Sequence, residues 1–381
     1  MKPYKKFFGI AALAFILSAV SAQAETVSQR ECCGSSKTVV DVAFVLDTTG
    51  SMTNLIEGAK RKIWSIATAI VDANPQATVR MALIGYRDHG DVYVTDTYPL
   101  TTDINALYGK LLSYKAKGGG DWPESVNEAL HIAITDLNWT EGSRARRLVF
   151  LVGDAPPHMD YEQDIPYPDA LKIAKRKNII VNAIQAGLAQ DTERVWRSIA
   201  QMGNGRYICI PQDGGVIMVE TPYDHDIQRL QNRLGETVVP YGTPKQAATV
   251  RRKVDWMNSA PAPTASDMAK FNATKSGRKE VVTGEGDLIA DAEEGKIKVG
   301  EIPTEQLEDS GTLAGMTPKD REAEVAKRIE ERKSIRSDLE VLIKKRDGFL
   351  TEARKTDSQG ADSFDRAIED LIREQAVPIT P

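Results

Sequence analysis

Cysteine and histidine are scarce in this sequence: its 381 residues include three cysteines and four histidines. No C-x-x-C pair and no Cys/His spacing of the zinc-binding kind occurs, which argues against a structural zinc site. In an oxidising compartment, either of the adjacent Cys32 and Cys33 could pair with Cys209 and leave one thiol over. The alternative is that Cys209 is simply a small residue within the strand-like segment RYICI.

An excess of basic residues is also lacking. Lysine and arginine number 49 against 54 aspartates and glutamates, so the net charge is −5. Because attraction to phosphate backbones needs a surface with excess positive charge, we expect no nucleic-acid partner.

Long apolar runs are missing everywhere except at the N-terminus. There, three lysines precede an apolar run over residues 7–20, and small residues follow at Ala22-Gln23-Ala24. This is the arrangement of a secretory signal cleaved after Ala24, and the run is too short for an ordinary transmembrane helix. An uncleaved anchor is the competing interpretation. We therefore expect a signal peptide over residues 1–24, a linker over 25–37, and an exported protein, periplasmic or extracellular, without a transmembrane segment.

Strand-like and helix-like segments alternate between residues 38 and 235. The apolar run TVVDVAFVL is followed by a helical pattern from Leu55 to Asp72, and the runs RRLVFLVGD and NIIVNAIQAG are separated by amphipathic segments. Continuous apolar strands between amphipathic helices indicate a mostly parallel sheet covered on both faces. The sequence predicts a doubly wound α/β domain over 38–235.

The chain changes character beyond this domain. Residues 240–277 are rich in Pro, Ala, Ser and Thr, which predicts a linker or partly ordered region over 236–316, with a hairpin around Glu294-Gly295. Residues 317–376 show two amphipathic helical patterns, the first with Thr317 as N-cap and Pro318 in its first turn. We expect them to form an antiparallel helical hairpin or coiled coil, through which the chain could self-associate.

Oxygen-bearing side chains gather where apolar strands end. Asp47 and Asp154 each end such a strand, Thr49 and Ser51 follow Asp47 at alternate positions, and Asp121 lies in the loop KGGGDWPE. Open parallel sheets bind ligands beyond the carboxyl ends of their strands, and hard divalent cations prefer several oxygen ligands. The sequence predicts one divalent cation held by these five residues, Mg²⁺ first and Mn²⁺ or Ca²⁺ as alternatives. The competing interpretation is a metal-free turn whose polar side chains cap a helix.

These motifs resemble those of von Willebrand factor type A (VWA) domains. DTTGSM is similar to the D-x-[ST]-x-S signature of that family, GGGDWPE to the third loop of one of its branches, and LVGDAPPH to the strand with its final aspartate. The resemblance implies a metal-ion-dependent adhesion site (MIDAS), in which Thr49 and Ser51 bind the cation directly and Asp47 and Asp154 directly or through water. Asp121 stands where many members have threonine. Its extra charge should raise cation affinity but weaken recognition of an acidic partner side chain.

Three further residues lie in loops that flank the predicted site: His89, Trp122 and His158. Each is a candidate for contact with a partner protein. The alternatives are ordinary loop positions for the two histidines and core packing for Trp122.

We expect an exported, non-enzymatic, cation-dependent protein-binding or adhesion module. One alternative is a metal-dependent hydrolase of the haloacid dehalogenase phosphatase type, but such an enzyme needs a second carboxylate where Thr49 stands. Another alternative is an assembly or maturation factor for an exported complex, which would use the same site on a different partner.

Overall fold

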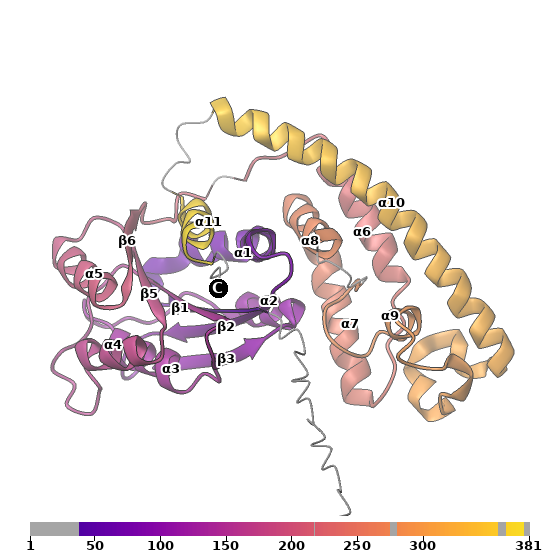
Figure 1. Ribbon diagram of the computed structural model, residues 1–381, viewed down its shortest axis with the longest axis horizontal. Coiled ribbons are helices and arrows are strands. Elements are labelled where there is room, and N and C mark those ends of the chain that lie inside the picture. The colour runs from indigo at the N-terminus through magenta and orange to yellow at the C-terminus, as the bar shows by residue number, and fades with distance from the viewer. Residues whose placement is uncertain (1–37, 217, 275–279, 357–362, 377–381) are drawn as a thin grey trace, which may run out of the picture. The chain divides into compact units, whose positions relative to one another are not determined.

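Six strands form one sheet in the computed structural model, which describes residues 38–216, 218–274, 280–356 and 363–376 (Figure 1). The strand order is β3-β2-β1-β4-β5-β6, and only β3 runs antiparallel to its neighbour. The strands are β1 (Val39–Asp47), β2 (Thr78–Tyr86), β3 (Thr95–Thr101), β4 (Ala145–Gly153), β5 (Ile180–Ala186) and β6 (Asn204–Ile210). The predicted signal peptide, the linker over 25–37, Cys32 and Cys33 lie outside the described residues.

Both faces of the sheet are covered by helices (Figure 1). In β1, Val42 and Phe44 belong to the core that includes α1 (Thr53–Ala73) and α2 (Ile104–Ser113), while Ala43 packs with the helices of the other face. Those helices are α3 (Val126–Thr135), α4 (Tyr167–Arg176) and α5 (Gln190–Met202). Because successive side chains of a strand face opposite sides, a strand covered on both sides must be apolar throughout. The predicted doubly wound, mostly parallel α/β fold is confirmed.

Residues 236–316 are not a linker, so that prediction was wrong. After α6 (Asp224–Glu236), the chain forms α7 (Pro244–Ser259), α8 (Ala262–Thr274), α9 (Leu288–Glu293) and the 3-10 segments η2 (Val299–Glu301) and η3 (Thr304–Gly315). Thr243 and Gln246 form a capping box that starts α7. The hairpin expected at Glu294-Gly295 is absent there, because α9 ends at that point with Glu294 as its C-cap.

The last two helices, α10 (Pro318–Thr356) and α11 (Phe364–Gln375), do not pair as the expected hairpin. Instead, α11 packs against α1 and β6. Its apolar residues Phe364 and Ile368 are buried in the same core as α1, and Lys62 of α1 lies 3.1 Å from Asp365. The apolar stripe of α11 therefore completes the cover of the sheet domain.

Cys209 on β6 has a free thiol that donates to the carbonyl oxygen of Gly187 at 3.1 Å.

None of the helices within the described ranges is long and apolar enough to cross a membrane.

Candidate metal centre

The first polar motif forms one turn at the carboxyl end of β1. Asp47 is fully buried, and its Oδ1 accepts hydrogen bonds from the backbone N–H of Thr49 at 2.8 Å and from Thr49 Oγ1 at 2.6 Å. Thr49 Oγ1 lies 3.3 Å from Ser51 Oγ, and Ser51 is exposed to solvent. The three oxygen-bearing residues therefore lie together, as the sequence predicts.

Asp154 is brought to the same place by the register of the sheet. Leu46 of β1 pairs with Val152 of β4, so the residues that follow the two strands are neighbours. Asp154 is buried, and its Oδ2 accepts a hydrogen bond from Gln212 Nε2 at 2.6 Å. Burial first, and then the negative charge of Asp154, raise the pKa of Asp47 to about 7.

A third buried carboxylate, Glu124, was not among the predicted ligands. Its backbone is held by hydrogen bonds from Glu124 N–H to the carbonyl oxygen of Pro156 and from His158 N–H to its own carbonyl oxygen, both 3.0 Å. Burial first, and then the charges of Asp47 and other nearby acidic residues, raise the pKa of Glu124 to about 9. The signal was present in the sequence, because Glu124 is the last residue of the motif GGGDWPE.

The glycine loop lies directly against the first motif. Gly50 N–H donates to the carbonyl oxygen of Gly118 at 3.1 Å. Gly119 has a φ of +80°, and a Cβ added there would come within 3.0 Å of Glu124 Oε1 and 3.2 Å of Thr49 Cβ. Only glycine allows this approach, which places Glu124 beside Thr49.

The residues present fit a hard divalent cation. Asp47 Oδ2 and Glu124 Oε2 are both buried and have no hydrogen-bond partner within the described part of the chain. Buried acceptors without a donor are costly, and so is the mutual repulsion of crowded carboxylates. A cation would offset both costs, and hydroxyl and carboxylate oxygens are the ligands that Mg²⁺ and Ca²⁺ prefer.

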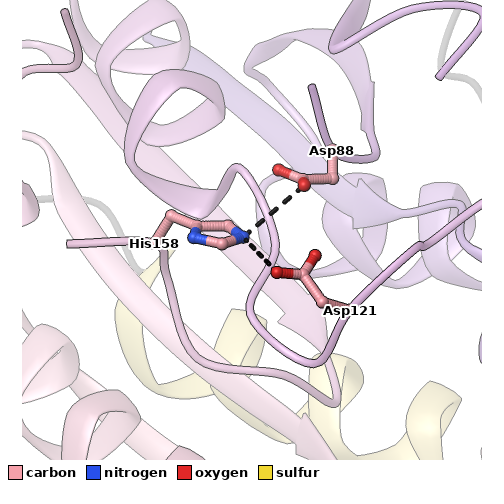
Figure 2. A group of neighbouring side chains, drawn as sticks. All are labelled: Asp88, Asp121 and His158. Carbon is pink, nitrogen blue, oxygen red and sulfur yellow. Dashed lines mark ion pairs between the residues drawn. The ribbon is translucent and has the colours of Figure 1, made fainter. Parts of the chain in front are cut away.

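Asp121, the remaining predicted ligand, lies next to His158. Its side chain is 63% exposed, and its Oδ2 is 3.6 Å from His158 Nε2, which also faces Asp88 at 3.5 Å (Figure 2). The loop is exposed from Gly118 to Trp122, and Glu124 is its first buried residue.

The two histidines differ in their surroundings. His158 is only 6% exposed, its Nδ1 is 2.9 Å from Asp160 Oδ1, and its ring stacks on Tyr161 with 4.1 Å between centroids. It is therefore not an ordinary exposed loop residue. His89 is more exposed, lies edge-on to Tyr161 at 4.7 Å, and has its Nε2 3.6 Å from Glu128.

Exposed apolar side chains surround this edge of the sheet. Trp122 is 47% exposed and donates its indole N–H to Asp191 at 2.7 Å, so it is not a core residue. Of the seven large hydrophobic residues exposed in the described part of the chain, five lie in loops at this edge: Val92, Trp122, Met159, Ile165 and Leu188. Such a concentration is typical of a surface that contacts other proteins.

Residues 41–219 match the family model of the von Willebrand factor A domain. A putative ariadne-like RING finger protein of Acanthamoeba polyphaga mimivirus is 29% identical over 123 residues, which are 32% of this chain and 12% of that protein. The chain thus spans only a small part of that relative. Among solved structures, the VWA domain of SpRpn10 is 16% identical with a TM-score of 0.35, covering 46% of this chain and 89% of that one. A pilus adhesin, SpaC from Lactobacillus rhamnosus GG, is 19% identical with a TM-score of 0.35, covering 45% of this chain and 28% of the adhesin.

Proposed function

We propose that the von Willebrand factor A domain formed by residues 41–219 binds a partner protein through a divalent cation. Domains of this family are protein-interaction modules in general, and the cation dependence is the finer proposal. The cation would be held at the carboxyl ends of β1 and β4 by Asp47, Thr49, Ser51 and Asp154, with Glu124 as an added ligand.

One observation carries this proposal: two buried carboxylate oxygens, Asp47 Oδ2 and Glu124 Oε2, have no described donor. A protein that only needed a helix cap at this turn would not need two buried acidic groups without partners. Mg²⁺ is the proposed ion, with Mn²⁺ and Ca²⁺ as alternatives, because the ligand set consists of oxygens. When bound, the cation would offer an open coordination position to a carboxylate of the partner.

The exposed residues around the site support a protein as the partner. Trp122, Met159 and Leu188 offer apolar and aromatic contact area at the same edge of the sheet. Aromatic residues and methionine are enriched in protein interfaces, and tryptophan often contributes strongly to their binding energy. A partner would thus combine one metal contact with a surrounding apolar contact.

The site favours binding over hydrolysis. Thr49 stands where a phosphatase of the type considered above would carry its proton donor, and its hydroxyl is itself bonded to Asp47. An assembly or maturation factor would use the same centre, and the identity of the captured partner distinguishes it from an adhesin.

Export of the protein is also proposed, from the lysines, the apolar run and the Ala-Gln-Ala sequence at the N-terminus. Sequencing the N-terminus of protein recovered from the periplasm or medium tests this. We expect the mature chain to begin at Glu25.

The cation is tested by calorimetric titration of metal-free full-length protein with Mg²⁺, Mn²⁺ and Ca²⁺. The full chain is needed because α8 and α11 cover α1. Ser51→Ala should abolish saturable binding, and Ser143→Ala, an exposed serine before β4, should not. Equal binding by both variants, or binding of none of the three cations, would reject the proposed centre.

A further inference from the structure

His158 points a buried nitrogen at two carboxylates. The residue is 6% exposed, and its Nε2 has no hydrogen-bond partner among the described residues. This atom lies 3.5 Å from Asp88 Oδ2 and 3.6 Å from Asp121 Oδ2 (Figure 2). Both separations exceed the range of about 2.7–3.2 Å for hydrogen bonds to oxygen.

The same separations match those of ligands that share one metal ion. Two donors bound at about 2.0–2.2 Å to a tetrahedral ion lie about 3.3–3.6 Å apart. The ligand atoms of Asp88, Asp121 and His158 all lie within 4.8 Å of one another.

Hydrogen bonds behind the cluster orient two of the three groups. Asp160 Oδ1 lies 2.9 Å from His158 Nδ1, which assigns the ring proton to Nδ1 and leaves the lone pair on Nε2. Asp88 Oδ1 accepts from Ser125 Oγ at 2.9 Å, and Asp88 Oδ2 accepts from Tyr161 OH at 2.9 Å. A carboxylate behind a histidine is the usual support of a metal-binding imidazole.

A lone pair that faces two carboxylates is repulsive unless a positive charge lies between them. A second ring proton would supply that charge, but it would favour a shorter contact with at least one carboxylate. We propose that Asp88, Asp121 and His158 form a second metal site, with ligands other than those of the centre at Asp47, that takes a transition-metal ion of the zinc class.

The ligand sets predict different metals for the two centres. The centre at Asp47 has only oxygens, which suit Mg²⁺ and Ca²⁺, whereas an imidazole nitrogen favours Zn²⁺ and similar ions. Three protein ligands leave a fourth position open, and the exposed Asp121 makes the site reachable from solvent.

The test uses metal-free full-length protein in saturating Mg²⁺, titrated with Zn²⁺ by calorimetry and with Co²⁺ by visible absorption. We expect one saturable site with a tetrahedral Co²⁺ band that Zn²⁺ removes. Asp121→Asn should weaken Zn²⁺ binding by about tenfold or more, in line with the loss of a metal-supporting group. Because Asp121 is exposed, this substitution should leave the fold intact.

Two controls and a second ligand variant distinguish this site from the centre at Asp47. His225→Gln changes an exposed histidine on α6 and should bind Zn²⁺ as the wild type does. Ser51→Ala should lose Mg²⁺ but keep Zn²⁺, and His158→Gln should lose the Co²⁺ band. No Zn²⁺ binding by the wild type, or unchanged binding in Asp121→Asn, would overturn the proposal in favour of a protonated His158.

Discussion

Asp47 is held by Thr49 through one carboxylate oxygen only. Its Oδ1 accepts both the backbone N–H and the hydroxyl of Thr49, at 2.8 and 2.6 Å, while Oδ2 is buried without a described donor. The turn therefore fixes the position of the carboxylate and leaves its second oxygen available to a cation. Removing the charge of Asp47 should therefore stabilise the metal-free protein but prevent cation binding.

Asp47→Asn should stabilise the metal-free protein at pH 8 and abolish cation binding. The asparagine Oδ1 can keep both bonds to Thr49, and the uncharged amide removes a buried charge next to Asp154. The expected gain in the free energy of unfolding is about 1–3 kcal/mol, because the repulsion by Asp154 is lost and the new amide N–H can donate to that carboxylate. Thermal unfolding in EDTA and Mg²⁺ titration measure the two effects.

The matched control for this variant is Asp136→Asn, because Asp136 is exposed at the end of α3. It should change neither the unfolding midpoint nor the affinity for Mg²⁺. A metal-free Asp47→Asn protein that melts lower than the wild type would show that the carboxylate is structural.

The stability of the metal-free protein should fall as the pH rises from 5 to 9. Unfolded carboxyl groups lose their protons near pH 4, whereas the raised pKa values of Asp47, about 7, and Glu124, about 9, keep protons on the folded protein. The folded state thus binds more protons in this window, so the free energy of unfolding decreases with pH. Cation affinity should increase over the same window, because the ligands must be deprotonated.

Melting temperatures in EDTA at pH 5, 7 and 9, and Mg²⁺ affinities at the same pH values, measure this dependence. Comparison with Asp47→Asn isolates the contribution of Asp47 from that of other titrating groups. If the difference between the two proteins does not change with pH, the raised pKa of Asp47 is refuted.

The sequence predicts the sheet and part of the centre because those features depend on local patterns. A continuous apolar run that ends in Asp47 or Asp154 is readable without tertiary information. Which acidic residue of the glycine loop is buried cannot be predicted in this way, because it depends on how the glycines turn the loop. Gly119 adopts a positive φ and brings Glu124 inward, and no spacing rule in the sequence specifies that turn.

Residues 236–316 fold into helices for a reason that their composition does not show. Their composition is that of a linker, and their helices are stabilised by contacts with residues far away in the chain. Phe271 of α8 packs edge-on against Trp64 of α1, with ring centroids 5.4 Å apart. Within the highly charged helix α10, Arg332 and Arg346 are buried. A periodicity of charges does not reveal such buried ion pairs.

Phe271→Ala should destabilise the protein by about 3–5 kcal/mol, because it removes a buried ring from a packed interior. Both Phe271 and Trp64 are almost fully buried. Denaturant unfolding followed by tryptophan fluorescence measures the loss. Phe349→Ala is the control, since Phe349 is 41% exposed on α10 and should have little effect. Equal effects of the two substitutions would contradict the packing of α8 on the sheet domain.

Arg346 should be a sensitive residue of α10, because it joins three helices. Its Nε donates to Asp224 of α6 at 2.7 Å, and its Nη1 donates to Asp267 of α8 at 2.8 Å. Arg346→Met leaves two buried carboxylates without their cation and should cost about 3–5 kcal/mol in the free energy of unfolding. Arg346→Lys should recover only part of this, since an ammonium lacks the planar fork that reaches both carboxylates. Lys333→Met, on the exposed side of the same helix, should leave the unfolding midpoint unchanged. If Arg346→Met unfolds at the same denaturant concentration as the wild type, α10 is not held to α6 and α8 by this residue.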